Sequence, residues 1–275
     1  MPRLSFRIGI PALAVWAGAL AVLAGAACSR GSSGRGTIVA GSTSIQPFAD
    51  RWAEVYMRKN PGKVVNVQGG GSSAGIEAAR SGAADIGMSS RELKPEEKDL
   101  SETVIARDGL AVIVHPSNPV SSLSLLEVKN IFNGNIRSWK VLGGTESMIT
   151  VVTREEGSGT RGAFQEMVMK KDRIARGAVV EDSNGTVREI VASDHNGVGY
   201  ISLGLVNDQV KAVRLEGVKP ARDEIDARRY RLVRPFLFVT KGPAKAAARE
   251  FIDFVLSPEG QRLIIQEGLL PAAAE

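Results

Sequence analysis

TIVAGSTSIQPFADRWAEVYMRK, residues 37–59, is the stretch of this sequence that best predicts its fold. Thr37 to Ala40 have the apolar character of a short buried strand, and a polar Gly-Ser-Thr-Ser turn follows them. From Gln46 to Lys59 the apolar residues recur with helical spacing, and Pro61 and Gly62 end that pattern. The stretch therefore predicts a strand, a turn and a helix in succession.

The same unit recurs twice along the chain. A strand over 64–67 leads through a Gly/Ser-rich turn at 69–75 to a helix over 76–80. A strand over 149–153 leads through the Gly-Ser-Gly-Thr turn at 157–160 to a helix over 162–171. Strands that alternate with helices are typical of α/β proteins with mainly parallel sheets. We therefore predict an α/β architecture.

These turns have the chemistry of an anion site. Glycines let backbone N–H groups converge, and the first turn of a helix leaves its N–H groups unpaired. The helix dipole adds about half a positive charge, and Ser and Thr hydroxyls add further donors. Arg154 and Arg161 flank the third turn, where a guanidinium can bind two oxygens of one oxyanion. Each turn alone is typical of ordinary helix capping, but the three together predict a site for a small oxyanion.

Two other functions can be compared with this prediction. The chain has no phosphate-binding loop of the G-x-x-x-x-G-K-[ST] type and no dinucleotide fingerprint, which argues against a nucleotide site. Residues 71–75 match the G-x-S-x-G nucleophile elbow of serine hydrolases, which leaves an enzyme as an alternative. The residues of that alternative would be Ser73, Asp182 or Asp194, and His195. No HGGG-type loop accompanies them, so we prefer anion binding over catalysis.

Composition limits the remaining classes. Of the 275 residues, 43% are hydrophobic, which suffices for a packed core, and 24% are charged. The net charge of +5 comes from interleaved basic and acidic residues, so no nucleic-acid partner is expected. The only histidines are His115 and His195 and the only cysteine is Cys28, so we expect no metal site, no internal disulfide and no cofactor.

The first 27 residues are predicted to be a signal peptide. Arg3 and Arg7 precede an apolar run that ends in small residues directly before Cys28. Cys28 resembles the lipidated cysteine of bacterial lipoproteins, although Gly25 stands where such proteins usually carry Leu. Residues 28–36 are predicted to be a flexible tether behind the lipidated cysteine. Cleavage would lower the net charge from +5 to +3. Secretion without a lipid and an uncleaved membrane anchor remain alternatives.

Seven segments together carry a family resemblance: GSTSIQPFADRWAEVY, QGGGSSAGIEAARSGAADIGMSSREL, GLAVIVHPSNPV, IFNGNIRSWKVLGG, REEGSGTRGAF, GVGYISLG and FIDFVLSPEGQ. In this order they resemble the substrate-binding lipoprotein of the bacterial phosphate ABC transporter, over nearly all of residues 37–271. The resemblance implies a two-lobed type II periplasmic-binding-protein fold with mixed sheets and flanking helices. It also implies a non-enzymatic monomer that binds inorganic phosphate in the cleft between its lobes and delivers it to a membrane permease.

The resemblance also implies which residues bind the ligand. They are Ser42, Thr43, Ser44, Ser72, Ser90, Arg154, Ser158, Gly159 and Thr160. Glu156 matches the acid that orients the arginine in that family. At the position of Ser90, better-known members have a carboxylate that accepts the proton of hydrogen phosphate, so discrimination against sulfate is expected to be weaker here. Another oxyanion, namely sulfate, molybdate or a phosphonate, is therefore the alternative ligand.

The resemblance further implies the route of the chain between the lobes. The first lobe would take residues 37–115, the second 116–229, and the chain would return to the first for 230–275. Two crossings between lobes would form a hinge. We expect Trp139 to pack in a core, the helix over 244–256 to bury its apolar stripe, and Asp85 to brace a strand end.

Overall fold

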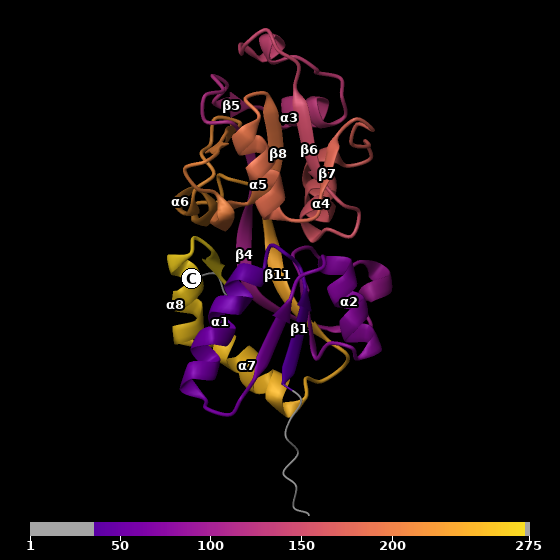
Figure 1. Ribbon diagram of the computed structural model, residues 1–275, viewed down its shortest axis with the longest axis vertical. Coiled ribbons are helices and arrows are strands. Elements are labelled where there is room, and N and C mark those ends of the chain that lie inside the picture. Colours follow the sequence, from indigo (N-terminus) through magenta and orange to yellow (C-terminus); the bar gives the residue numbers. More distant parts are fainter. Residues whose placement is uncertain (1–35, 273–275) are drawn as a thin grey trace, which may run out of the picture. The chain divides into compact units, whose positions relative to one another are not determined.

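The structure is a computed structural model that describes residues 36–272, shown in Figure 1. The predicted signal peptide, Cys28 and the tether up to residue 35 lie outside the described residues. Within residues 36–272, no helix is both long enough and apolar enough to cross a membrane.

The first two strand, turn, helix units begin the lower lobe in Figure 1. In chain order its elements are β1 (Thr37–Gly41), α1 (Gln46–Lys59), β2 (Val65–Gln68), α2 (Ser72–Ser81) and β3 (Ile86–Ser89). The strands β2 and β3 pair with β1 on either side, and both pairs are parallel. Helix α1 has the predicted bounds. Helix α2 begins four residues earlier than predicted, so the serines at 72 and 73 lie in its first turn.

Two long strands connect the lobes. They are β4 (Ser101–Val114) and β11 (Val233–Thr240), which pair antiparallel to each other. Strand β11 also pairs antiparallel with β3, and β4 pairs antiparallel with β8 (Gly197–Ser202). The strand order is β2-β1-β3-β11-β4-β8-β6-β7, so one curled mixed sheet runs through the molecule. The prediction of mainly parallel strands holds for the repeated units, whereas the crossing strands are antiparallel.

The third unit lies in the upper lobe in Figure 1. Strand β6 (Thr150–Arg154) leads into α4 (Gly159–Phe164), which continues as a π-helical turn over Gln165–Met169. Strand β6 is parallel to both β7 (Val179–Glu181) and β8. The remaining elements of this lobe are β5 (Ser122–Leu123), α3 (Leu125–Phe132), α5 (Asn184–Ser193), β9 (Lys211–Ala212), β10 (Arg214–Leu215) and α6 (Arg222–Asp226).

After β11 the chain stays in the lower lobe. Helices α7 (Ala246–Leu256) and α8 (Pro258–Gln266) contact α1, and β12 (Leu270–Pro271) pairs with β4. Phe251 and Val255 of α7 are buried in the core of this lobe, as predicted for that helix. Asp85 braces β1 as predicted, because its carboxylate accepts a hydrogen bond from the Ile38 N–H.

Each lobe has its own large hydrophobic core. The core of the lower lobe surrounds Trp52 and Phe238, and that of the upper lobe surrounds Trp139 and Phe132. Trp139 is fully buried, and its indole N–H donates to a backbone carbonyl, so the prediction that it packs in a core is confirmed. The crossing strands supply residues to both cores, so a boundary drawn by residue number passes through the strands themselves.

Candidate anion site

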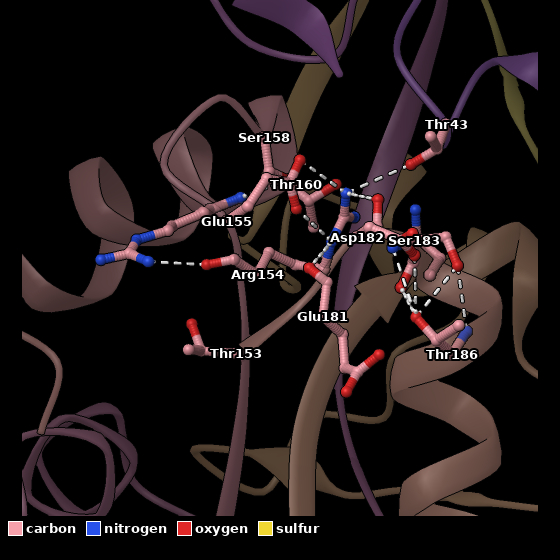
Figure 2. A network of polar contacts seen from close by, with 12 residues as sticks. Thr43, Thr153, Arg154, Glu155, Ser158, Thr160, Glu181, Asp182, Ser183 and Thr186 are labelled. Atoms are coloured by element: carbon pink, nitrogen blue, oxygen red, sulfur yellow. Dashed lines mark hydrogen bonds and ion pairs between the residues drawn. The ribbon is translucent and has the colours of Figure 1, made fainter. Parts of the chain in front are cut away.

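The three predicted turns meet where the lobes face each other. Ser44 of the lower lobe lies 2.7 Å, Oγ to Oγ1, from Thr160 of the upper lobe. Arg154 Nη2 donates to Thr43 Oγ1 over 3.2 Å, and in Figure 2 a dashed line joins these two side chains. The backbone N–H of Ser73 donates to the Gly157 carbonyl over 3.1 Å. Residues far apart in the sequence therefore form one polar cluster.

The lower lobe contributes a compact group of buried serines. Ser42 Oγ donates to Ser90 Oγ over 2.9 Å, and the Ser90 N–H donates to Ser72 Oγ over 3.1 Å. These serines follow β1, begin α2 and follow β3, respectively. Because β1 and β3 are parallel, their carboxyl ends lie at the same edge of the sheet, where the start of α2 also lies.

Gly159 shows how closely the lobes approach. A Cβ added at Gly159 would lie 2.1 Å from Ser72 Oγ and 2.6 Å from Ser90 Oγ, far below any normal contact. Gly159 is the first residue of α4, and its partners belong to the opposite lobe. Only glycine therefore permits this approach of the two lobes.

Arg154 is the cationic group of the cluster. It is the last residue of β6, and only 1% of its surface is exposed. Its Nε donates to the Glu181 carbonyl over 3.1 Å, and its Nη2 donates to the Asp182 carbonyl over 2.8 Å. Nη1 is buried and has no hydrogen-bond partner, a property that only one other buried side-chain polar atom of residues 36–272 shares. Buried donors are almost always paired, so this guanidinium is ready to donate to a ligand.

The acid beside Arg154 is Glu155, and the expectation for Glu156 is wrong. Glu155 accepts hydrogen bonds from Arg154 Nε and Nη2, both over 3.1 Å. The Glu156 side chain is 92% exposed and only approaches Arg161, at 3.8 Å. The chain turns outward after β6, so that the residue next to Arg154 folds back onto it whereas the following one points to solvent.

Burial strongly affects this pair of charges. Desolvation lowers the pKa of the Arg154 guanidinium and raises the pKa of the Glu155 carboxyl, while the attraction between the two charges opposes both shifts. An anion that approaches Nη1 would add a second negative charge to a guanidinium already partly neutralised. The site thus combines one arginine with many neutral donors.

Arg161 has a supporting position. Its Nη1 donates to the Arg154 carbonyl, and its backbone N–H donates to Ser158 Oγ, the N-cap of α4. A cavity of about 600 Å³ opens beside the cluster, with Ser73 and Arg91 lining it from the lower lobe and Ser158 and Arg161 from the upper one. This cavity lies on the solvent side of the third turn.

Sequence reasoning missed a buried ion pair under the cluster. Arg234 of β11 and Asp108 of β4 are almost completely buried, and Arg234 Nε and Nη2 donate to Asp108 Oδ2 over 3.0 and 2.9 Å. Burial raises the pKa of Asp108 and lowers that of Arg234, and the opposite charge of each partner counteracts these shifts. A single charge within each of two long apolar strands was the available signal.

Asn184 was missed as well. It begins α5, is buried, and its Nδ2 donates to Ser44 Oγ over 2.9 Å. In the sequence it stands in a polar Asp-Ser-Asn-Gly run, which resembles an ordinary turn.

The residues of the hydrolase alternative do not come together. His195 hydrogen-bonds with His115 and Ser117, whereas Ser73 Oγ accepts from Arg91. The histidine pair, with ring centroids 4.0 Å apart, lies at the junction before β8 in the upper lobe. Within residues 36–272, no three His, Cys, Asp or Glu side chains are grouped so as to hold a metal ion.

Comparisons with known proteins agree on the class. The sequence model of the PBP superfamily domain matches residues 27–259. The phosphate-binding protein PstS of Bacillus subtilis is 35% identical over 241 residues, which cover 85% of this chain and 79% of that protein. The matched length shows that the class is the periplasmic binding proteins.

Solved structures give the same result. A phosphate ABC transporter substrate-binding protein from Clostridium perfringens, solved with bound phosphate, is 41% identical with a TM-score of 0.84, covering 86% of this chain and 99% of that one. An ABC-type phosphate transport receptor from Vibrio cholerae is 37% identical with a TM-score of 0.72, covering 85% and 99%. The chain belongs to the family of phosphate-binding proteins within the periplasmic binding protein superfamily. The predicted fold class and family are thus confirmed.

Proposed function

We propose that this protein binds inorganic phosphate between its lobes and delivers it to the permease of an ABC transporter. The observation that carries this proposal is the unpaired, buried Nη1 of Arg154 at the meeting point of Ser and Thr hydroxyls from both lobes. Relatives that carry phosphate in their names or in their crystals support the choice of anion. The protein acts by closure and release, without catalysis.

The ligand residues of the proposal are those the family resemblance implied. They are Ser42, Thr43, Ser44, Ser72, Ser90, Arg154, Ser158, Gly159 and Thr160, with Glu155 in place of Glu156 as the partner of the arginine. The lobes of the proposal are 37–115 with 230–275, and 116–229. Closure then consists of bending at β4 and β11, the two strands that join the cores.

The proposal extends to the cellular setting. Cleavage after residue 27 and lipidation of Cys28 would attach a monomer to the outer side of the cell membrane through the tether over 28–36. Such attachment would keep the protein near its permease.

Isothermal titration calorimetry tests the binding. We expect phosphate to bind more tightly than sulfate or molybdate, and each bound anion to raise the melting temperature by mass action. Sulfate is the informative competitor, because Ser90 replaces the carboxylate that accepts the proton of hydrogen phosphate in the better-known members. A folded protein that shows no heat with millimolar phosphate would refute the proposal, and tighter binding of sulfate would change its ligand.

A further inference from the structure

Ser44 occupies an unusual position in the cluster, because three groups contact its one hydroxyl. Asn184 Nδ2 lies 2.9 Å from Ser44 Oγ, and Arg234 Nη2 lies 3.2 Å from it. The third contact is Thr160 Oγ1 at 2.7 Å. All four residues are at most 3% exposed, so water does not compete for these hydrogen bonds.

The orientation of the Asn184 amide follows from its other contact. The backbone N–H of Ser202 donates to Asn184 Oδ1 over 3.1 Å, and a backbone N–H can only donate. The amide oxygen therefore faces Ser202, and the amide nitrogen faces Ser44. Asn184 is thus a donor to the Ser44 hydroxyl.

Arg234 is likewise a fixed donor. A guanidinium has no acceptor, and Asp108 and the Ser90 carbonyl hold it in place from two further directions. Asp108 also accepts from Ser202 Oγ over 2.8 Å. The contacts close into a ring that passes through Asp108, Arg234, Ser44, Asn184 and Ser202.

A hydroxyl oxygen accepts two hydrogen bonds and donates one. Because Asn184 and Arg234 occupy both acceptor positions of Ser44, its single hydrogen must go to Thr160 Oγ1. Thr160 then accepts from Ser44 and keeps its own hydrogen for another partner. We propose that Asn184 and Arg234 are positioning residues that orient the Ser44 hydroxyl so that Thr160 is always a donor toward the bound anion.

This polarity matters for recognition of a doubly charged anion. If Thr160 donated to Ser44 instead, it would present only lone pairs to the anion and repel it. A fixed donor favours the dianion HPO₄²⁻, whereas a hydroxyl turned around would favour the monoanion H₂PO₄⁻, which can donate to it. The inference rests on the proposed phosphate function, and it adds two residues that do not touch the ligand.

The test reverses the polarity with Asn184→Asp. A carboxylate at 184 accepts from both Ser202 and Ser44, so the Ser44 hydrogen turns away from Thr160, and Thr160 donates to Ser44. We expect calorimetry at pH 8 to show phosphate binding about tenfold to a hundredfold weaker, the loss of one hydrogen bond to a charged group. At pH 5.5, where the monoanion dominates, the loss should be smaller.

The new negative charge alone would also weaken binding, so the same change is made in a Ser44→Ala background. There the charge remains but the relay through Ser44 is absent, and the loss caused by Asn184→Asp should shrink by about fivefold or more. Equal losses in both backgrounds would overturn the proposal. Wild-type protein is titrated first, because failure of wild type to bind phosphate refutes the function itself rather than the relay.

A second pair of variants covers the case in which Asn184→Asp does not fold. Thr160→Val keeps the shape of the side chain and removes its hydroxyl, and Thr160→Ser restores the hydroxyl. We expect binding at pH 8 to fall about tenfold or more in the valine variant and to be largely restored in the serine variant. Phosphate affinity of Thr160→Val equal to that of wild type would show that Thr160 donates nothing to the anion, and would overturn the proposal.

Discussion

The guanidinium of Arg154 is oriented before any anion arrives. Backbone carbonyls of Glu181 and Asp182 hold it on one side, and Glu155 and Thr43 hold it on others. A side chain ordered in advance loses little entropy when the ligand binds, so more of the interaction energy appears as affinity. Arg161 differs, because its contacts are to the protein backbone and Glu156.

We therefore expect Arg154→Ala to weaken phosphate binding about thirtyfold to several thousandfold, the cost of removing one partner of a buried charge pair. Arg161→Ala should weaken binding far less, because only the support of the Arg154 carbonyl and the second turn of the α4 region is lost. Calorimetric titration of both variants checks this expectation. Equal losses would show that Arg154 is not the principal cation.

Single residues were predictable from sequence only where the chain itself makes the site. The hydroxyls of Ser42, Thr43 and Ser158 lie on turns next to strands, and that local pattern was visible. Glu155 was confused with its neighbour, since the direction of a side chain after a strand depends on how the turn folds back. Asn184 and Arg234 act through contacts with residues more than a hundred positions away, which no local pattern encodes.

At the scale of elements, two helices begin inside segments that the sequence predicts as turns. Helix α2 begins at Ser72 and α4 begins at Gly159, although Ser and Gly have low helix propensity and favour turns. Tertiary contacts overcome this preference, because the opposing lobe packs against both first turns. Helix α1 was predictable over its full length, since its own apolar spacing defines it.

The approach of these two helix starts gives a prediction for Gly159→Ala. The added methyl would collide with Ser72 Oγ and Ser90 Oγ, so full closure should be prevented and phosphate binding should weaken about tenfold or more. Gly177→Ala is the matched control, because a Cβ there has no neighbour within 4 Å. Titration of both variants measures the effect. Unchanged affinity in Gly159→Ala would mean that the lobes need not approach this closely to bind.

At the scale of the whole molecule, two hydrophobic cores share two strands. Leu110, Val112 and Val114 of β4 belong to the upper core, whereas Ile105 and Ala106 of the same strand belong to the lower one. Strand β11 adds Phe236 and Phe238 to the lower core, and Leu232 directly before it packs in the upper core. Neither core can lose its order without disturbing a strand of the other.

We expect calorimetry to show one unfolding transition for the whole molecule. Trp52→Ala in the lower core and Trp139→Ala in the upper core should each lower that same transition, at a cost of about 3–5 kcal/mol for a large cavity. A variant that splits the transition into two would show that the lobes unfold independently.

The place of β11 between β3 and β4 also determines the order in which the chain can fold. The upper lobe uses a nearly continuous stretch, so all of its strands are present once residue 215 has emerged. The sheet of the lower lobe needs β11, and its last strand, β12, ends at residue 271. Contacts between distant residues form slowly, because a long loop must close first. A chain emerging from its amino terminus therefore completes the lobe it started last.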